Sequence, residues 1–129
     1  MELAPKIHYS VLVIDDDPQI TELLKESLED ESLVVYCKHS GEDALNFLSF
    51  TKVDCIVLDV YMPKMSGPEI IQALRQKKDQ TPFFYITGYL DSPRENLNLF
   101  KPQAIIFKPF DFEEAVALIK NYLSKNSRL

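Results

Sequence analysis

Five short runs of apolar, mostly β-branched residues alternate along the chain with segments whose apolar residues recur at helical spacing. A continuous run such as Val11-Leu12-Val13-Ile14 is typical of a strand buried on both faces of a parallel sheet. The repeated strand-helix order predicts an α/β fold with a parallel sheet and helices on both faces. The remaining predicted strands occupy residues 33–37, 55–58, 83–86 and 104–107.

Helix start signals follow the predicted strands. Pro18 is expected to open a helix that ends near Leu28, because the first N–H of a helix needs no intrahelical partner. Ser40 and Asp111 are predicted N-caps of a second and a last helix, since their side chains can accept hydrogen bonds from backbone N–H groups. A short polar helix is predicted at residues 94–100, and a further helix carries the apolar stripe Ile70, Ile71 and Leu74.

The composition is that of one globular domain. The 129 residues are 46% hydrophobic and 26% charged, which supplies a core without disulfide or metal staples. We expect a short leader at residues 1–8, a single domain at residues 9–125 and a tail at residues 126–129. The formal net charge is −6 and the basic residues are scattered, so binding of nucleic acid by this chain is not expected.

Membrane insertion and secretion are not expected either. No apolar run approaches the roughly 20 residues that a helix needs to span a bilayer. The sequence starts without a signal peptide, and its two cysteines, Cys37 and Cys55, lack the spacing of a metal site. These features indicate a protein of the reducing cytoplasm, in which both cysteines are small buried side chains.

Polar side chains stand at the ends of four predicted strands. Asp15 and Asp16 follow the first, Asp59 the third, Thr87 the fourth and Lys108 the fifth. In an open parallel sheet, ligands bind at the edge formed by the carboxyl ends of the strands. Three carboxylates at one place repel one another unless a cation binds, and oxygen ligands suit Mg²⁺ first. The pattern therefore predicts a magnesium site at this edge.

Such a site suits phosphoryl chemistry, because Mg²⁺ leaves an open position for a phosphoryl oxygen. Lys108 can pair with Asp59 when the carboxylate is free, and with a phosphoryl group once one is attached. Thr87 can donate a hydrogen bond to another phosphoryl oxygen. A metal ion, an ammonium and a hydroxyl together balance the charge of a transferring phosphoryl group, which leaves Asp59 as the nucleophile.

Four segments of the sequence resemble the receiver domains of two-component response regulators. VLVIDDDPQI resembles the first strand and acidic pair of that family, and CIVLDVYMPKMSG resembles its phosphoacceptor segment. YITGY and IIFKPF resemble the ends of its fourth and fifth strands, with the family's Thr and Lys-Pro. The resemblance extends over roughly residues 9–125.

This resemblance implies a flavodoxin-like fold, in which a five-stranded parallel sheet has the order 2-1-3-4-5 and helices cover both faces. Strands two and three are then not neighbours, so a disulfide between Cys37 and Cys55 is not expected. The resemblance also implies that Asp59 becomes an aspartyl phosphate beside Thr87 and Lys108. The implied ligands of Mg²⁺ are Asp15, Asp16, Asp59 and the backbone carbonyl of Tyr61.

The implied partners are those of a phosphorelay. A sensor histidine kinase or a histidine phosphotransfer protein donates the phosphoryl group. The response passes to a downstream protein or to an output domain that is not in this chain. The chain is then not an enzyme with a separate substrate, because it catalyses only its own phosphorylation and dephosphorylation.

Several positions depart from the family pattern. Ile105 stands three residues before Lys108, where receivers commonly carry the Tyr or Phe that moves with the Thr on phosphorylation. This predicts a weakened or rerouted conformational response. Tyr61 and Tyr89 flank the phosphoryl position and are expected to shield it from water, which predicts slow dephosphorylation. Residues 97–102 lack the glycine that often precedes the fifth strand and are expected to be irregular.

Two alternatives stay open. Asp15-x-Asp17 after an apolar strand also resembles the D-x-D motif of haloacid-dehalogenase-like phosphatases. Pro18 follows where that motif normally has Thr or Val, and Asp17 is expected to cap the first helix instead. The second alternative is a degenerate receiver that serves only as a protein-binding module, and the unusual Ile105 is the reason to consider it.

Overall fold

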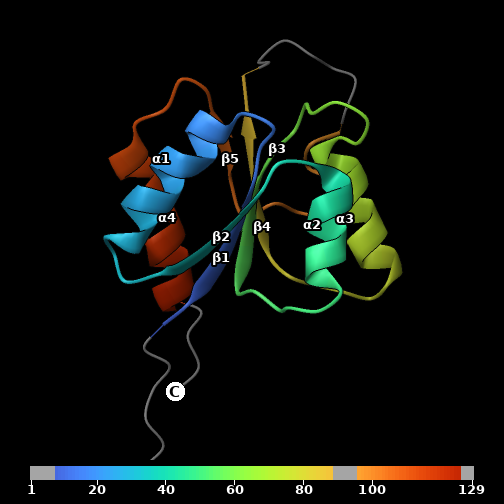
Figure 1. Ribbon diagram of the computed structural model, residues 1–129, viewed down its shortest axis with the longest axis horizontal. Coiled ribbons are helices and arrows are strands. Elements are labelled where there is room, and N and C mark those ends of the chain that lie inside the picture. Colours follow the sequence, from blue (N-terminus) through green and yellow to red (C-terminus); the bar gives the residue numbers. More distant parts are fainter. Residues whose placement is uncertain (1–7, 89–95, 126–129) are drawn as a thin grey trace, which may run out of the picture.

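The strands of the protein form one parallel sheet in the predicted order. The computed structural model describes residues 8–88 and 96–125 (Figure 1). Five strands lie in the order β2-β1-β3-β4-β5, and each neighbouring pair is parallel. The strands are β1 (Ser10–Ile14), β2 (Val34–Lys38), β3 (Cys55–Asp59), β4 (Phe83–Thr87) and β5 (Ile105–Phe107).

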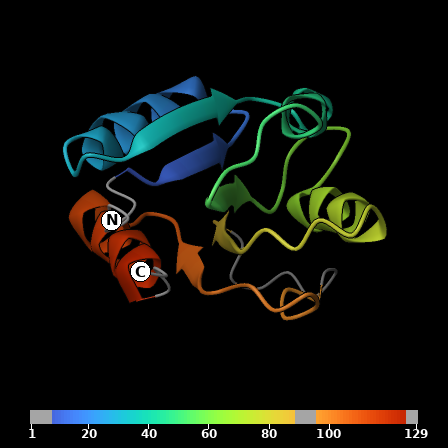
Figure 2. The ribbon, with the colours of Figure 1, turned by 90° about the horizontal axis from the view of Figure 1, so that it is seen from below.

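Helices cover both faces of this sheet, as predicted. Within the described residues, α1 and α4 pack together on one face, and α2 and α3 pack together on the other (Figures 1 and 2). This arrangement explains why the central strands are apolar along their whole length: neither face of them meets water. The helices are α1 (Pro18–Glu29), α2 (Gly41–Leu48), α3 (Gly67–Gln76) and α4 (Phe112–Lys125).

Side chains alternate between two hydrophobic cores. Val11 and Val13 point toward α1 and α4, whereas Leu12 and Ile14 point toward α2 and α3. All four side chains are fully buried. Because β1 and β3 contribute to both cores, a residue that follows either strand is held on a backbone that is packed from two sides.

The predicted caps and the predicted absence of a disulfide are confirmed. The side chain of Asp17 accepts a hydrogen bond from Gln19 N at 2.9 Å, and Asp111 accepts one from Glu113 N at 2.8 Å. The side chain of Ser40 likewise accepts from the backbone of α2. Both cysteines are free thiols and lie on β2 and β3, which β1 separates.

The helix predicted at residues 94–100 is wrong for residues 96–100, which form a turn; residues 89–95 lie outside the described part of the chain. The side chain of Asn96 accepts a hydrogen bond from Asn98 N at 3.1 Å, which offers the backbone an alternative to a helix. Phe100 and Lys101 then adopt left-handed backbone angles, with φ of 65° and 59°. The expectation of an irregular path at residues 97–102 is thereby confirmed.

Candidate functional site

The carboxyl edge of the sheet collects the polar residues that the sequence placed at strand ends. Asp59 and Thr87 are the last residues of β3 and β4, and Asp15 and Lys108 directly follow β1 and β5. The backbone there is tied across strands: Asp15 N donates to Lys38 O at 3.2 Å, and Lys108 N donates to Thr87 O at 2.8 Å. The sheet therefore fixes the starting point of each side chain.

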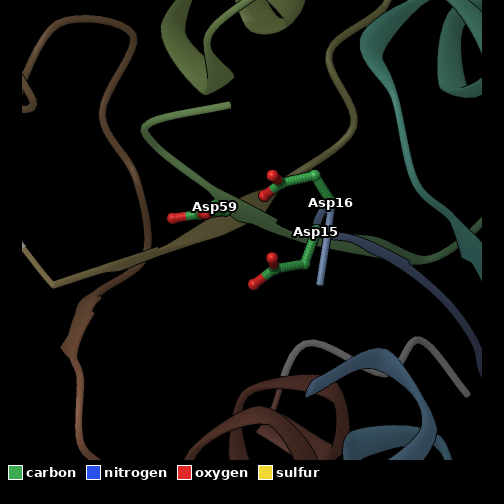
Figure 3. Close-up of side chains that lie close together, drawn as sticks. All are labelled: Asp15, Asp16 and Asp59. Carbon is green, nitrogen blue, oxygen red and sulfur yellow. The ribbon is translucent and has the colours of Figure 1, made fainter. Parts of the chain in front are cut away.

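Three carboxylates meet at this edge (Figure 3). One oxygen from each of Asp15, Asp16 and Asp59 lies within 4.8 Å of the other two. Asp15 and Asp59 are 0% and 6% exposed, while Asp16 is exposed to solvent. Oxygen atoms at this spacing form a ligand set for a hard divalent cation, with an open side toward solvent.

Burial makes the two inner carboxyl groups difficult to ionise. Loss of solvent, together with the charge of Asp15, raises the pKa of Asp59 to about 6, although Lys108 acts in the opposite direction. Burial also raises the pKa of Asp15, against a lowering by the Asp17 backbone and by Lys108. The cluster thus lacks positive charge, which is the electrostatic condition for binding a cation.

Lys108 supplies part of that missing charge. Its Nζ lies 3.1 Å from Asp15 Oδ2 and 3.4 Å from Asp59 Oδ2. Burial alone lowers the pKa of Lys108, but the contacts with Asp15 and Asp59 outweigh it and raise that pKa above its usual value. The expected pairing with Asp59 is present; the shorter contact with Asp15 was not anticipated.

The other predicted residues are placed as follows. Thr87 is fully buried at the end of β4. Tyr61 is half-buried in the loop after β3 and packs against the core beneath α2 and α3. Tyr89 lies outside the described residues. Asp17 does not belong to the carboxylate cluster: its side chain caps α1, and its backbone N–H donates to Asp15 Oδ1 at 3.0 Å.

Gly67 supports the site in a way that sequence reasoning missed. A Cβ added at Gly67 would stand 2.5 Å from the backbone oxygen of Asp59, so only glycine allows α3 to start this close to β3. Gly67 N also donates to Val60 O at 2.8 Å. The sequence showed this glycine only as a loop breaker; the close approach depends on how the loop folds back.

The family of the chain follows from comparison with known proteins. A family model for the response regulator receiver domain matches residues 11–120. The transcriptional regulatory protein CpxR of Escherichia coli K12 is 38% identical over 117 residues, which cover 90% of this chain and 50% of that protein. TrcR of Mycobacterium tuberculosis is 32% identical over 133 residues, covering 97% of this chain and 51% of that protein.

Solved structures agree with this assignment. The receiver domain of Francisella response regulator 1452 superposes with a TM-score of 0.81 at 25% identity, covering 91% of this chain and 98% of that chain. TrrA from Thermotoga maritima, solved in complex with Mg²⁺-BeF, superposes with a TM-score of 0.77 at 31% identity, covering 88% of this chain and 97% of that chain.

The chain belongs to the response regulator receiver family and is a receiver domain of two-component signal transduction. It is a signalling domain that spans about half the length of the curated relatives it matches. Neither alternative, a haloacid-dehalogenase-like phosphatase or a degenerate binding module, is supported by these relationships. Among the described residues, no helix has the length and apolarity required to cross a membrane.

Proposed function

We propose that Asp59 accepts a phosphoryl group from a sensor histidine kinase or a histidine phosphotransfer protein in a Mg²⁺-dependent reaction. The observation that carries the proposal is the packing of three carboxylates within 4.8 Å, with the ammonium of Lys108 bridging the two buried ones. Repulsion between these carboxylates would only destabilise a cluster with a purely structural role. A site for a metal ion and a phosphoryl group needs the carboxylates close together, because they hold the metal ion.

The donor set fits Mg²⁺. The carboxylates of Asp15, Asp16 and Asp59 would hold the ion, together with the backbone carbonyl of Tyr61 that the resemblance implies, and all four donors are oxygen atoms of the kind this ion prefers. Burial raises the pKa values of Asp15 and Asp59, and the charge of Asp15 adds to the shift at Asp59, so a divalent cation at this place would favour the ionised form of both groups. When bound, Mg²⁺ supplies positive charge against the oxygens of the incoming phosphoryl group.

The residues of the chain then divide the remaining work. An oxygen of Asp59 attacks phosphorus, a P–O bond forms, and the P–N bond to the donor histidine breaks with its electron pair returning to the imidazole nitrogen. Lys108 exchanges its contact with the Asp59 carboxylate for one with a phosphoryl oxygen. Thr87, at the end of the adjacent strand, donates its hydroxyl hydrogen to another.

The proposal extends to the protein that contains this domain. Residues 9–125 form the receiver unit, between a leader at residues 1–8 and a tail at residues 126–129. The phosphorylated domain acts on a downstream protein or on an output domain not in this chain, and it turns over no separate substrate. The two free thiols suit a reducing compartment, so we place the reaction in the cytoplasm.

The test is intact mass after incubation with acetyl phosphate and Mg²⁺. Wild type should gain one phosphoryl group, and the gain should vanish without Mg²⁺ or in Asp59→Asn. Glu69→Gln, at the start of α3 and outside the carboxylate cluster, serves as the matched control and should be phosphorylated like wild type. A phosphoryl group retained by Asp59→Asn would show that another residue is the acceptor.

A further inference from the structure

A groove at the amino edge of the sheet has no part in the phosphoacceptor site. It measures about 430 Å³ and is lined by the ends of α2 and α3 and by the loops that lead from them to β3 and β4. Asp59 and Thr87 stand at the opposite ends of these same two strands. A molecule bound in the groove therefore leaves the carboxylate cluster accessible.

The groove has an apolar floor and a cationic rim. Leu74 is buried, and Leu45 and Leu48 are half-buried. The rim carries three exposed lysines, which are Lys52, Lys77 and Lys78. Within residues 8–88 and 96–125, none of these three ammonium groups forms a salt bridge. This is a local excess of positive charge on a chain whose formal net charge is −6.

Asp79, the acidic residue on this rim, forms hydrogen bonds within its own loop. Asp79 Oδ1 accepts hydrogen bonds from Thr81 N at 2.9 Å and from the Thr81 hydroxyl at 2.5 Å. Arg75 holds the same loop by donating to the backbone oxygens of Asp79 and Thr81, at 2.7 and 3.0 Å. These hydrogen bonds fix the loop. The Asp79 carboxylate is occupied by Thr81, while the lysines of the rim are exposed to solvent.

An exposed aromatic ring lies in the turn after α2, where it lines a separate hollow with Phe47 and Lys38. Phe50 lies between the lining residues Ser49 and Lys52, and it is 85% exposed. Its backbone N donates to Phe47 O at 3.1 Å, so the turn that carries the ring is ordered. The ring is therefore an ordered, exposed apolar group that is close to Lys52 in sequence but lies outside the groove.

We propose that this groove docks an acidic segment of a partner protein, with an apolar side chain of that segment on the leucine floor. Charge complementarity selects this occupant. Carboxylates placed against the rim meet three unpaired ammonium groups at short range, while the negative charges elsewhere on the chain are screened beyond about 10 Å at ordinary salt. An anionic membrane is a larger surface that would also come near acidic residues outside the groove. Repulsion from those residues disfavours a membrane as the partner.

The test titrates ¹⁵N-labelled protein with a short acetylated peptide in which leucines alternate with glutamates. Amide shifts should concentrate at the ends of α2 and α3 and in the loops that follow them. Lys77→Gln/Lys78→Gln should weaken binding about tenfold, since each exposed ion pair contributes a modest amount. A peptide with glutamine in place of glutamate should bind to wild type at least as weakly as the glutamate peptide binds to Lys77→Gln/Lys78→Gln.

The matched control is Lys25→Gln/Lys120→Gln, which removes the same charge from α1 and α4 and should bind like wild type. Asp59→Asn should also bind like wild type, so the result is independent of the phosphoacceptor proposal. Three outcomes would overturn the inference: equal binding of the glutamine peptide, shifts centred on α1 and α4, or binding to phosphatidylserine vesicles without binding to the peptide.

Discussion

Carboxylates at the two edges of the sheet have opposite effects on the stability of the fold. At the amino edge, Asp54 accepts hydrogen bonds from Ser10 N at 2.7 Å and from the Ser10 hydroxyl at 3.3 Å, which joins β1 to the start of β3. At the carboxyl edge, Asp59 faces two other acids, and its pKa is raised to about 6. The first arrangement stabilises the fold. The second makes folding less favourable, as is expected of a site that is built to bind ligands.

The largest effect is expected where the carboxyl edge tolerates no added atom. Gly67→Ala places a Cβ 2.5 Å from the Asp59 backbone oxygen, so α3 must shift. We expect a loss of about 3 kcal/mol in the free energy of unfolding, together with poor phosphorylation. Urea denaturation measures the loss. Gly88→Ala is the control, because among the described residues its Cβ meets only Lys108 side-chain atoms, at the ordinary contact distances of 3.7 and 3.9 Å. Equal losses would contradict the close-approach argument.

Neutralising Asp59, the proposed acceptor, should stabilise the metal-free protein. The pKa of Asp59 is raised in the fold, so its ionised form destabilises the native state at neutral pH and ceases to do so as the pH falls from about 6 to 4. Asp59→Asn should gain about 2 kcal/mol at pH 7 and little at pH 4. Thermal unfolding at the two pH values is the measurement, and a gain that persists at pH 4 would point to packing instead.

Binding of Mg²⁺ should compete with protonation of Asp59. With one proton titrating near pH 6, the apparent affinity for Mg²⁺ should fall about tenfold between pH 7 and pH 5. Isothermal titration calorimetry or tyrosine fluorescence can follow it. In Asp59→Asn the affinity should be lower and should depend less on pH. A flat profile in wild type would mean that Asp59 does not ligate the ion.

Removing the charge at the other edge should have the opposite sign. Asp54→Asn weakens the acceptor for Ser10 N, so we expect a loss of about 1 kcal/mol in the free energy of unfolding. Phosphorylation with acetyl phosphate should be unchanged, because Asp54 directly precedes β3 and Asp59 is its last residue. If Asp54→Asn were as stabilising as Asp59→Asn, the contrast between the edges would fail.

The smallest effect on stability is expected for a substitution at Ile105, which tests how far the response to phosphorylation extends from the carboxyl edge. Ile105 pairs with Tyr85 across β5 and β4, and it remains a prediction that this residue weakens or reroutes the response to phosphorylation. Ile105→Tyr should change stability by less than about 1 kcal/mol. On addition of Mg²⁺ and beryllofluoride, amide shifts should extend further through β4 and β5 in the variant. Identical shift patterns would argue against the prediction.

Most of the fold was predictable because the apolar runs report burial directly. The continuous apolar run Val11 to Ile14 is typical of a strand covered on both faces, and all four side chains are buried. The strand ends then place Asp15, Asp59 and Thr87 at one edge. The turn at residues 96–100 was not predictable from helical spacing, because a local hydrogen bond to the Asn96 side chain competes with the helix.

The site was predictable as a set of residues but not as a set of contacts. The Lys108–Asp15 pair joins residues that follow β5 and β1, which are not neighbours in the sheet, so no local pattern reports it. The fit of Gly67 against Asp59 likewise depends on the path of a loop. These contacts belong to the assembled edge and have no counterpart in the periodicity of any one segment.

The reach of Lys108 has a mechanical consequence for the outermost strand. β5 has three residues and, among the described strands, pairs only with β4. Lys108, which follows β5, forms ion pairs with Asp15 and Asp59 at the centre of the sheet. The strength of these ion pairs depends on the charge that the two carboxylates carry. Phe107 directly precedes Lys108 and is 45% exposed, so we expect a change in the charge of these buried acids to alter the protein surface at this ring.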